Sequence, residues 1–121
     1  MTTAVKGRES TEGVRVRVEP EACGFAAVVR VRPTGEGRFR VSVESGCDSV
    51  NHWIDALEPE ETLALLRPAG AARFLAGALK ALPHVTCPVP LGILRAVEVL
   101  AGAALPSVAV IRTESEHSKT T

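Results

Sequence analysis

The sequence predicts an α+β domain in which a small, mostly antiparallel sheet carries its helices on one face. Three observations support this class. Three early segments alternate apolar and charged residues with a period of two, which is typical of half-buried strands. The segments that follow repeat apolar residues at helical spacing. A last apolar stretch near the C-terminus completes the order strand–strand–strand–helices–strand.

The strands come first. Residues 14–19, VRVRVE, alternate valine with charge and predict a strand. Residues 24–33 and 37–45 predict two more strands, which the glycine-containing turn TGEG separates. Residues 107–113, SVAVIRT, are apolar on both faces and predict an interior last strand.

Helices are expected between these strands. One is predicted over residues 48–57, a second begins near Pro59 with acidic residues in its first turn, and a third covers residues 71–82. After the CPVP stretch, a long helix carries a set of apolar residues on one face. These residues are Ile93, Val97, Leu100 and Ala104.

Composition limits the domain organisation and the function. The 121 residues suit a single domain over residues 13–113, with polar, patternless tails at 1–12 and 114–121. The 14 basic and 14 acidic residues balance and aromatics make up only 3%, which argues against nucleic acid as a partner. No secretory signal or membrane-spanning stretch is evident, which predicts a cytoplasmic protein without a membrane partner. A protein partner or a homo-oligomer remains open.

The cysteines predict a site. If the hairpin turns around Gly35, Val29 pairs with Val41, and the same register continued outward places Cys23 opposite Cys47. Directly opposite side chains have Cβ atoms about 4.5–5.5 Å apart. The two thiols are therefore expected to meet on the core-facing side of the sheet.

Two of the three cysteines also stand at predicted helix starts. Cys47 begins CDSVNHW and Cys87 precedes Pro88, so both lie near the positive end of a helix dipole, where the pKa of a thiol is lowered. His84, three residues before Cys87, offers a nitrogen ligand. The predicted metal ligands are thus Cys23, Cys47, Cys87 and His84.

A plainer interpretation treats the cysteines as unrelated core residues, since free cysteine is often buried. The strong motifs C-x₂-C, P-loop and HExxH are absent from the sequence, so it predicts no reaction and leaves open whether the protein is an enzyme. The arginines of the second and third strands predict a solvated sheet face, with contact to an anion or nucleic acid as the alternative. These arginines are Arg30, Arg32, Arg38 and Arg40.

Three stretches, EACGFAAVVRV, VESGCDSV and CPVPLGILRAVEVLAGAALP, resemble an uncharacterised family of small bacterial and archaeal proteins. That family carries Cys-Gly-Phe, Ser-x-Cys and Cys-Pro-Val-Pro at corresponding places. The resemblance covers about residues 14–112 and implies that Cys23, Cys47 and Cys87 are shared. Leu91 stands where some members have a further cysteine. The resemblance implies a site, without an activity.

Two hypotheses of different classes follow. In the first, the three cysteines hold zinc or an iron–sulfur cluster, with His84, water or sulfur at a fourth position. In the second, the protein is a non-catalytic accessory or binding module with structural cysteines. A Cys23–Cys47 disulfide switch with Cys87 as resolving thiol is a third interpretation.

Overall fold

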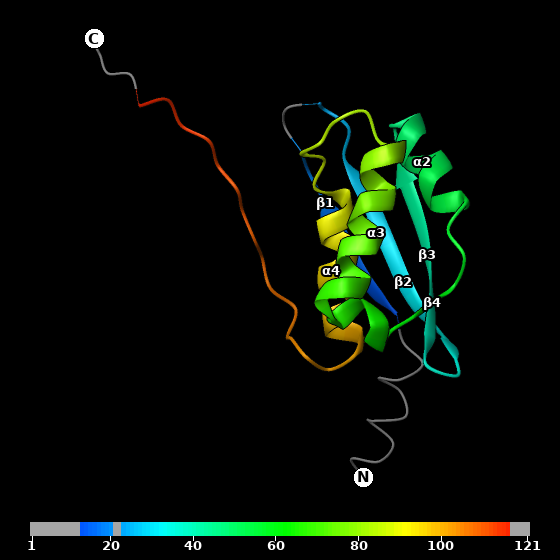
Figure 1. Cartoon of the computed structure of the whole chain (residues 1–121). Helices are drawn as coiled ribbons and strands as arrows, with labels where there is room; N and C mark the ends of the chain where they lie inside the picture. The colour runs from blue at the N-terminus through cyan, green and yellow to red at the C-terminus, as the bar shows by residue number, and fades with distance from the viewer. Residues whose placement is uncertain (1–12, 21–22, 117–121) are drawn as a thin grey trace.

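The computed structural model describes residues 13–20 and 23–116 of the chain. Four antiparallel strands form one sheet in the order β1-β2-β3-β4. The strands are β1 (Val14–Val18), β2 (Ala27–Gly35), β3 (Arg38–Ser45) and β4 (Glu60–Glu61). The helices are α2 (Asp48–Asp55), the 3₁₀ turn η1 (Leu63–Leu66), α3 (Pro68–Ala81) and α4 (Val89–Leu100). Helices α3 and α4 cover one face of the sheet (Figure 1), which confirms the predicted α+β class.

Alternation along β1, β2 and β3 separates a core face from an open face. Val29, Val31 and Phe39 are essentially fully buried under the helices. The other face carries arginines, and the register sets two pairs of them directly opposite each other: Arg15 opposite Arg30, and Arg32 opposite Arg40. The sheet is therefore amphipathic, as the period of two predicts.

The register of the β2–β3 hairpin differs from the prediction by two residues. Val29 pairs with Val43 instead of Val41, and the last pair is Ala27 with Ser45. The physical reason is the turn: Gly35, Glu36 and Gly37 all have positive φ, and the register shifts between Pro33 and Gly35. A shift of two keeps every side chain on its predicted face. The pairing ends before Cys23 and Cys47, so the predicted cross-strand cysteine pair is wrong.

Helix α4 supplies much of the core above β1 and β2. Ile93 and Val97 have no exposed surface, as their spacing predicts. Gly92 lies so close to β1 that a Cβ at this position would be 3.0 Å from Val18 Cγ2. Close approach of a helix to a strand at a glycine brings the apolar rows of both elements into contact.

Helices α2 and α3 close the rest of the core. The ring of Trp53 packs on that of Phe74, with centroids 5.5 Å apart and planes inclined at 51°. Such tilted packing is favourable for aromatic pairs beyond the area they bury. None of the helices in the described part of the chain is long and apolar enough to cross a membrane.

Two elements predicted from the sequence are absent from the residues that the structure describes. The helix predicted near Pro59 is replaced by β4 and the short turn η1, because Thr62 donates its backbone N–H to Gly37 and so holds this segment against the hairpin. Residues 107–113, predicted as an interior strand, form no strand and are exposed throughout. They have no neighbouring strand to pair with in the described part of the chain. The predicted tail 1–12, and residues 117–121 of the other, lie outside the described residues.

Candidate functional site

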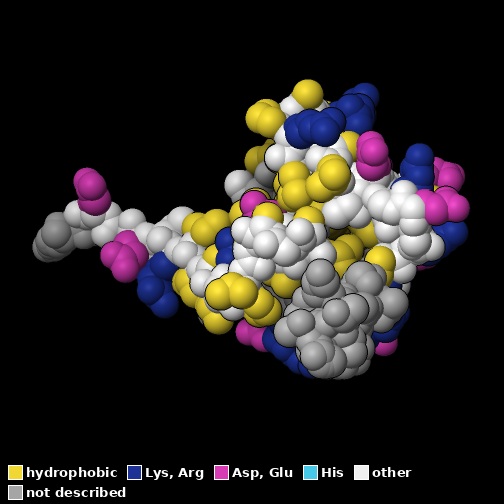
Figure 2. Space-filling model, turned by 90° about the horizontal axis from the view of Figure 1, so that it is seen from below, with side chains coloured by type: hydrophobic (Ala, Val, Ile, Leu, Met, Phe, Trp, Pro, Cys, Tyr) yellow, Lys and Arg dark blue, Asp and Glu magenta, His cyan; other side chains and the backbone are white. Residues whose placement is uncertain are grey.

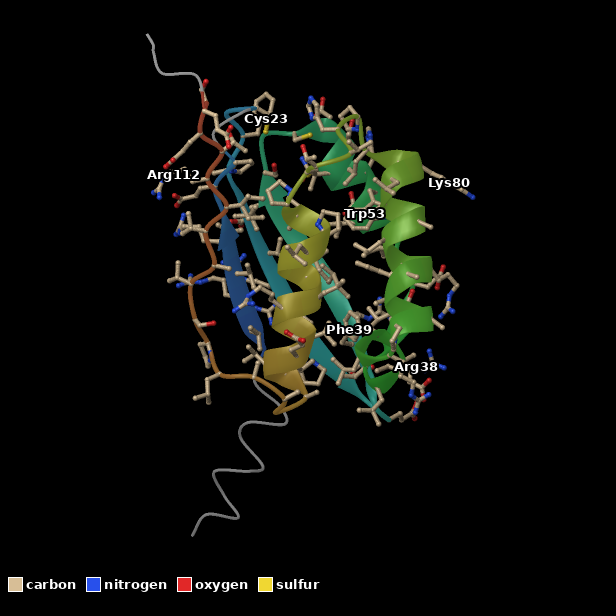
Figure 3. The ribbon with its side chains drawn as sticks, turned by 60° about the vertical axis from the view of Figure 1, so that its left-hand side comes forward. Cys23, Arg38, Phe39, Trp53, Lys80 and Arg112 are labelled. Atoms are coloured by element: carbon tan, nitrogen blue, oxygen red, sulfur yellow. The ribbon has the colours of Figure 1, made fainter. Side chains whose placement is uncertain are left out.

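The three cysteines lie on three separate connections. Cys23 follows β1, Cys47 precedes α2, and Cys87 lies between α3 and α4. These connections come together at one end of the molecule, where Figure 3 labels Cys23 and where Figure 1 shows the same three segments. All three are free and half-buried. The three connections that carry the cysteines therefore share one end of the fold, although the predicted strand pairing is absent from the described residues.

Packing between a phenyl ring and a glycine joins the first two cysteine segments. A Cβ at Gly46 would lie 3.0 Å from a ring carbon of Phe25, so the ring sits directly on the backbone next to Cys47. Phe25 is itself 48% exposed. Since Phe25 belongs to Cys-Gly-Phe and Gly46 to Ser-Gly-Cys, this contact brings the two motifs side by side.

Cys23 occupies a tight turn. Its thiol faces the carbonyl oxygen of Pro20, with Sγ and O 3.9 Å apart, and the N–H of Gly24 donates to the same oxygen. Gly24 has a φ of 76°, which disfavours any side chain there. The glycine of this motif thus shapes the turn that presents the thiol.

Cys47 is the N-cap of α2, where the sequence places it. Its backbone N–H donates to Ser45 Oγ at 3.0 Å, and Asn51 Nδ2 donates to the carbonyl oxygen of Ser45 at 3.0 Å. The side chain of Cys47 packs against the edge of the core. These hydrogen bonds fix the end of β3 against the first turns of α2 and hold Cys47 between them.

Cys87 behaves differently from the prediction. Burial raises the pKa of its thiol, and the charges of Cys23 and Cys47 raise this pKa further. The backbone of Val89 acts in the opposite direction through a hydrogen bond, which is the helix-start effect that the sequence suggests. Desolvation outweighs it, so the predicted lowering of the Cys87 pKa is wrong. Cys23 and Cys47 therefore each lie close enough to Cys87 to act on its thiol.

His84 shares a turn with Cys87, whose backbone N–H donates to the His84 carbonyl oxygen at 3.2 Å. Its imidazole is exposed to solvent. Among the described residues, no group of three or more His, Cys, Asp or Glu side chains is arranged to hold a metal ion. The predicted ligands are therefore neighbours in the fold without forming an assembled coordination shell.

Three residues of this site do not follow from a search for metal ligands in the sequence: Phe25, Ser45 and Asn51. Phe25 and Ser45 stand inside the Cys-Gly-Phe and Ser-x-Cys motifs, which is a signal that they belong to the site. Asn51 is signalled by its spacing, since residue 51 lies one helical turn beyond the N-cap. All three position backbone next to a cysteine, and none carries the chemistry.

Two surface hollows lie away from the cysteines. One, of about 120 Å³, lies between α2 and α3 beside Trp53, Phe74 and Arg73. The other, of about 320 Å³, lies on the open sheet face beside Arg30, Arg32 and Arg40. Neither combines a nucleophile with a base, so the thiols remain the strongest candidate for chemistry.

The region that this chain shares with a known family coincides with the folded elements described above. No curated protein and no solved structure matches the chain. The model of the family of unknown function DUF6951 matches residues 14–113, which includes every strand, helix and cysteine described above. The chain belongs to this family of unknown function, DUF6951.

Proposed function

We propose that the protein binds zinc or an iron–sulfur cluster through Cys23, Cys47 and Cys87. The observation that carries this proposal is that the three connections bearing the free, half-buried cysteines meet at one end of the fold. The charges of Cys23 and Cys47 add to burial in raising the pKa of Cys87, so both act on this thiol. Thiolates brought together repel one another, and a bound cation removes that repulsion.

The donor set fits a soft metal. Thiolates select zinc and iron–sulfur clusters and are poor ligands for magnesium or calcium. Three protein thiolates leave a fourth position, which His84, water or a sulfur ligand can complete. The donors must approach one another on binding, because the described residues hold no assembled shell. Such a site supplies folding energy as it closes.

Proton release gives the proposal a second readout. The thiols must lose their protons to bind metal, and burial already favours the neutral form of Cys87. Metal affinity therefore rises with pH and falls in acid. Zinc titration at several pH values, with proton release followed calorimetrically, measures this dependence.

The decisive experiment is anaerobic purification, with iron, zinc and acid-labile sulfide quantified per chain. We expect about one zinc or one cluster per chain, lost in each of Cys23→Ser, Cys47→Ser and Cys87→Ser. His84→Ala tests the fourth position, and His52→Ala, another exposed histidine, is its matched control. Metal retained in all three serine variants would contradict the proposal, as would a metal-free protein with three titratable thiols.

A second candidate is a non-catalytic binding module, in which the cysteines are structural. It is favoured by the exposed apolar side chains after α4, which include Val108 and Ile111. This function predicts mild, independent effects of the three cysteine substitutions on stability. It also predicts no stoichiometric metal.

A further inference from the structure

The segment that follows α4 is apolar but contacts little of its own chain. Leu105, Val108, Val110 and Ile111 are between 68% and 88% exposed. Figure 2 shows this segment extending from the body with hydrophobic side chains along it. Apolar residues that are clustered and exposed in one molecule usually mark a surface where a second one binds.

The segment is part of the domain that the family shares. The match to the family extends to residue 113, well beyond the end of α4 at Leu100. A hydrogen bond from Arg95 to the hydroxyl of Ser107 ties the beginning of the segment to α4. The hydrogen bond anchors the first residue of the apolar run to α4.

Strand β1 offers a complementary surface. It is the outer strand of the sheet and pairs with β2 on one side. The other edge has no strand beside it in the described part of the chain. An open edge presents a row of N–H and C=O groups that another extended segment can pair with.

The segment fits this edge by its pattern. Val108, Val110 and Arg112 alternate with Ala109 and Ile111, so as a strand it would bring apolar side chains to both faces. Ile111 could then pack under the helical layer, while Arg112 would share the open face with the arginines of β1. Three of these residues, Val108, Val110 and Ile111, are β-branched and therefore favour extended structure.

The segment does not pair with the β1 edge of its own chain. Residues 107–113 form no strand and are exposed throughout. In Figure 1 the segment runs away from the body of the molecule and leaves the outer edge of β1 open. The same edge of a second molecule is therefore available to it.

We infer that residues 107–113 add as a strand to the β1 edge of a second copy of this chain. The exchange is reciprocal: each molecule donates its segment and receives the other's, as in a twofold dimer. The exchange buries the exposed apolar side chains and completes the open edge of both sheets. It requires no metal and is independent of the proposed thiol site.

Sedimentation equilibrium of the full chain over a range of concentrations tests this inference. We expect a mass twice that of the 12.7 kDa chain. Val110→Asp and Ala109→Pro should each weaken the dimer at least tenfold, the first through charge and the second through the lost N–H. Leu63→Asp is the matched control, since Leu63 is 58% exposed and lies beside β4, at the opposite edge of the sheet. It should leave the dimer unchanged.

Hydrogen exchange identifies the occupant. In the wild-type dimer, the amides of residues 107–113 and of the outer edge of β1 should be protected together, and Ala109→Pro should remove the protection at both places. A monomer at high concentration would overturn the inference. If the segment's amides were protected in that monomer, its own β1 edge would be the partner. A dimer that persists in both segment variants would place the interface elsewhere and would overturn it too.

Discussion

Helix α4 and the segment after it make an instructive pair, because both are apolar and both belong to the region shared by the family. Ile93 in α4 has no exposed surface, whereas Ile111 in the segment is 80% exposed. The helix satisfies its own backbone hydrogen bonds and needs only a surface to pack on. An extended segment needs a neighbouring strand as well. Apolar pattern thus predicts burial only where the partner is available.

The same isoleucine truncation at the two places should give the largest difference. Ile93→Ala should lower the free energy of unfolding by about 2–5 kcal/mol, because it leaves a cavity in the core. Ile111→Ala should change it by less than about 0.5 kcal/mol in a dilute, monomeric sample. Urea unfolding measures both. Equal losses in the monomer would mean that the segment packs on its own domain.

Two glycine substitutions compare a crowded helix with an open one. Gly92→Ala should destabilise the protein by about 1–3 kcal/mol, since the new Cβ would meet Val18 and Val16 at 3.0 and 3.3 Å. Gly77→Ala in α3 meets nothing within 4 Å and should stabilise by about 0.5–1 kcal/mol. Thermal unfolding checks both signs. A stabilising Gly92→Ala would show that α4 is less tightly seated on β1.

A smaller, pH-dependent effect compares the thiol end with the rest of the fold. The pKa of Cys87 is raised in the folded state, so folding favours the protonated thiol. This contribution is complete below the thiol pKa of the unfolded chain, about 8.5, and is lost as the pH rises through the folded value. Stability of the reduced, metal-free protein should therefore fall at alkaline pH. Cys87→Ser should flatten this fall, and an identical slope in both proteins would refute the assignment.

Much of this fold follows from local pattern. The three valine-rich strands, helix α2 and the buried face of α4 at Ile93 and Val97 are all predictable, because alternation and helical spacing survive in the final structure. The predicted register is wrong by two residues because positive φ at Glu36 moves the centre of the turn, and no residue preference predicts positive φ at a glutamate.

The candidate site was predictable in part. The positions of Cys47 and Cys87 beside helix starts follow from capping and proline preferences. The raised pKa of Cys87 does not follow from these preferences, since desolvation depends on tertiary packing that residue spacing does not reveal. Likewise, the contact between Phe25 and Gly46 joins segments about twenty residues apart, and it replaces the strand pairing expected for the cysteines.

The facing arginines of the open sheet face make the protein's stability sensitive to ionic strength. Arg32 and Arg40 stand directly opposite each other, as do Arg15 and Arg30, and like charges at such positions repel. Glu44 lies 3.8 Å from Arg30 and relieves one pair in part. Arg40→Gln should therefore stabilise the protein by a few tenths of a kcal/mol (~0.2–1) in dilute buffer. Dissolved salt screens the same repulsion, so this gain should shrink as sodium chloride is added, whereas a gain independent of salt would have another origin.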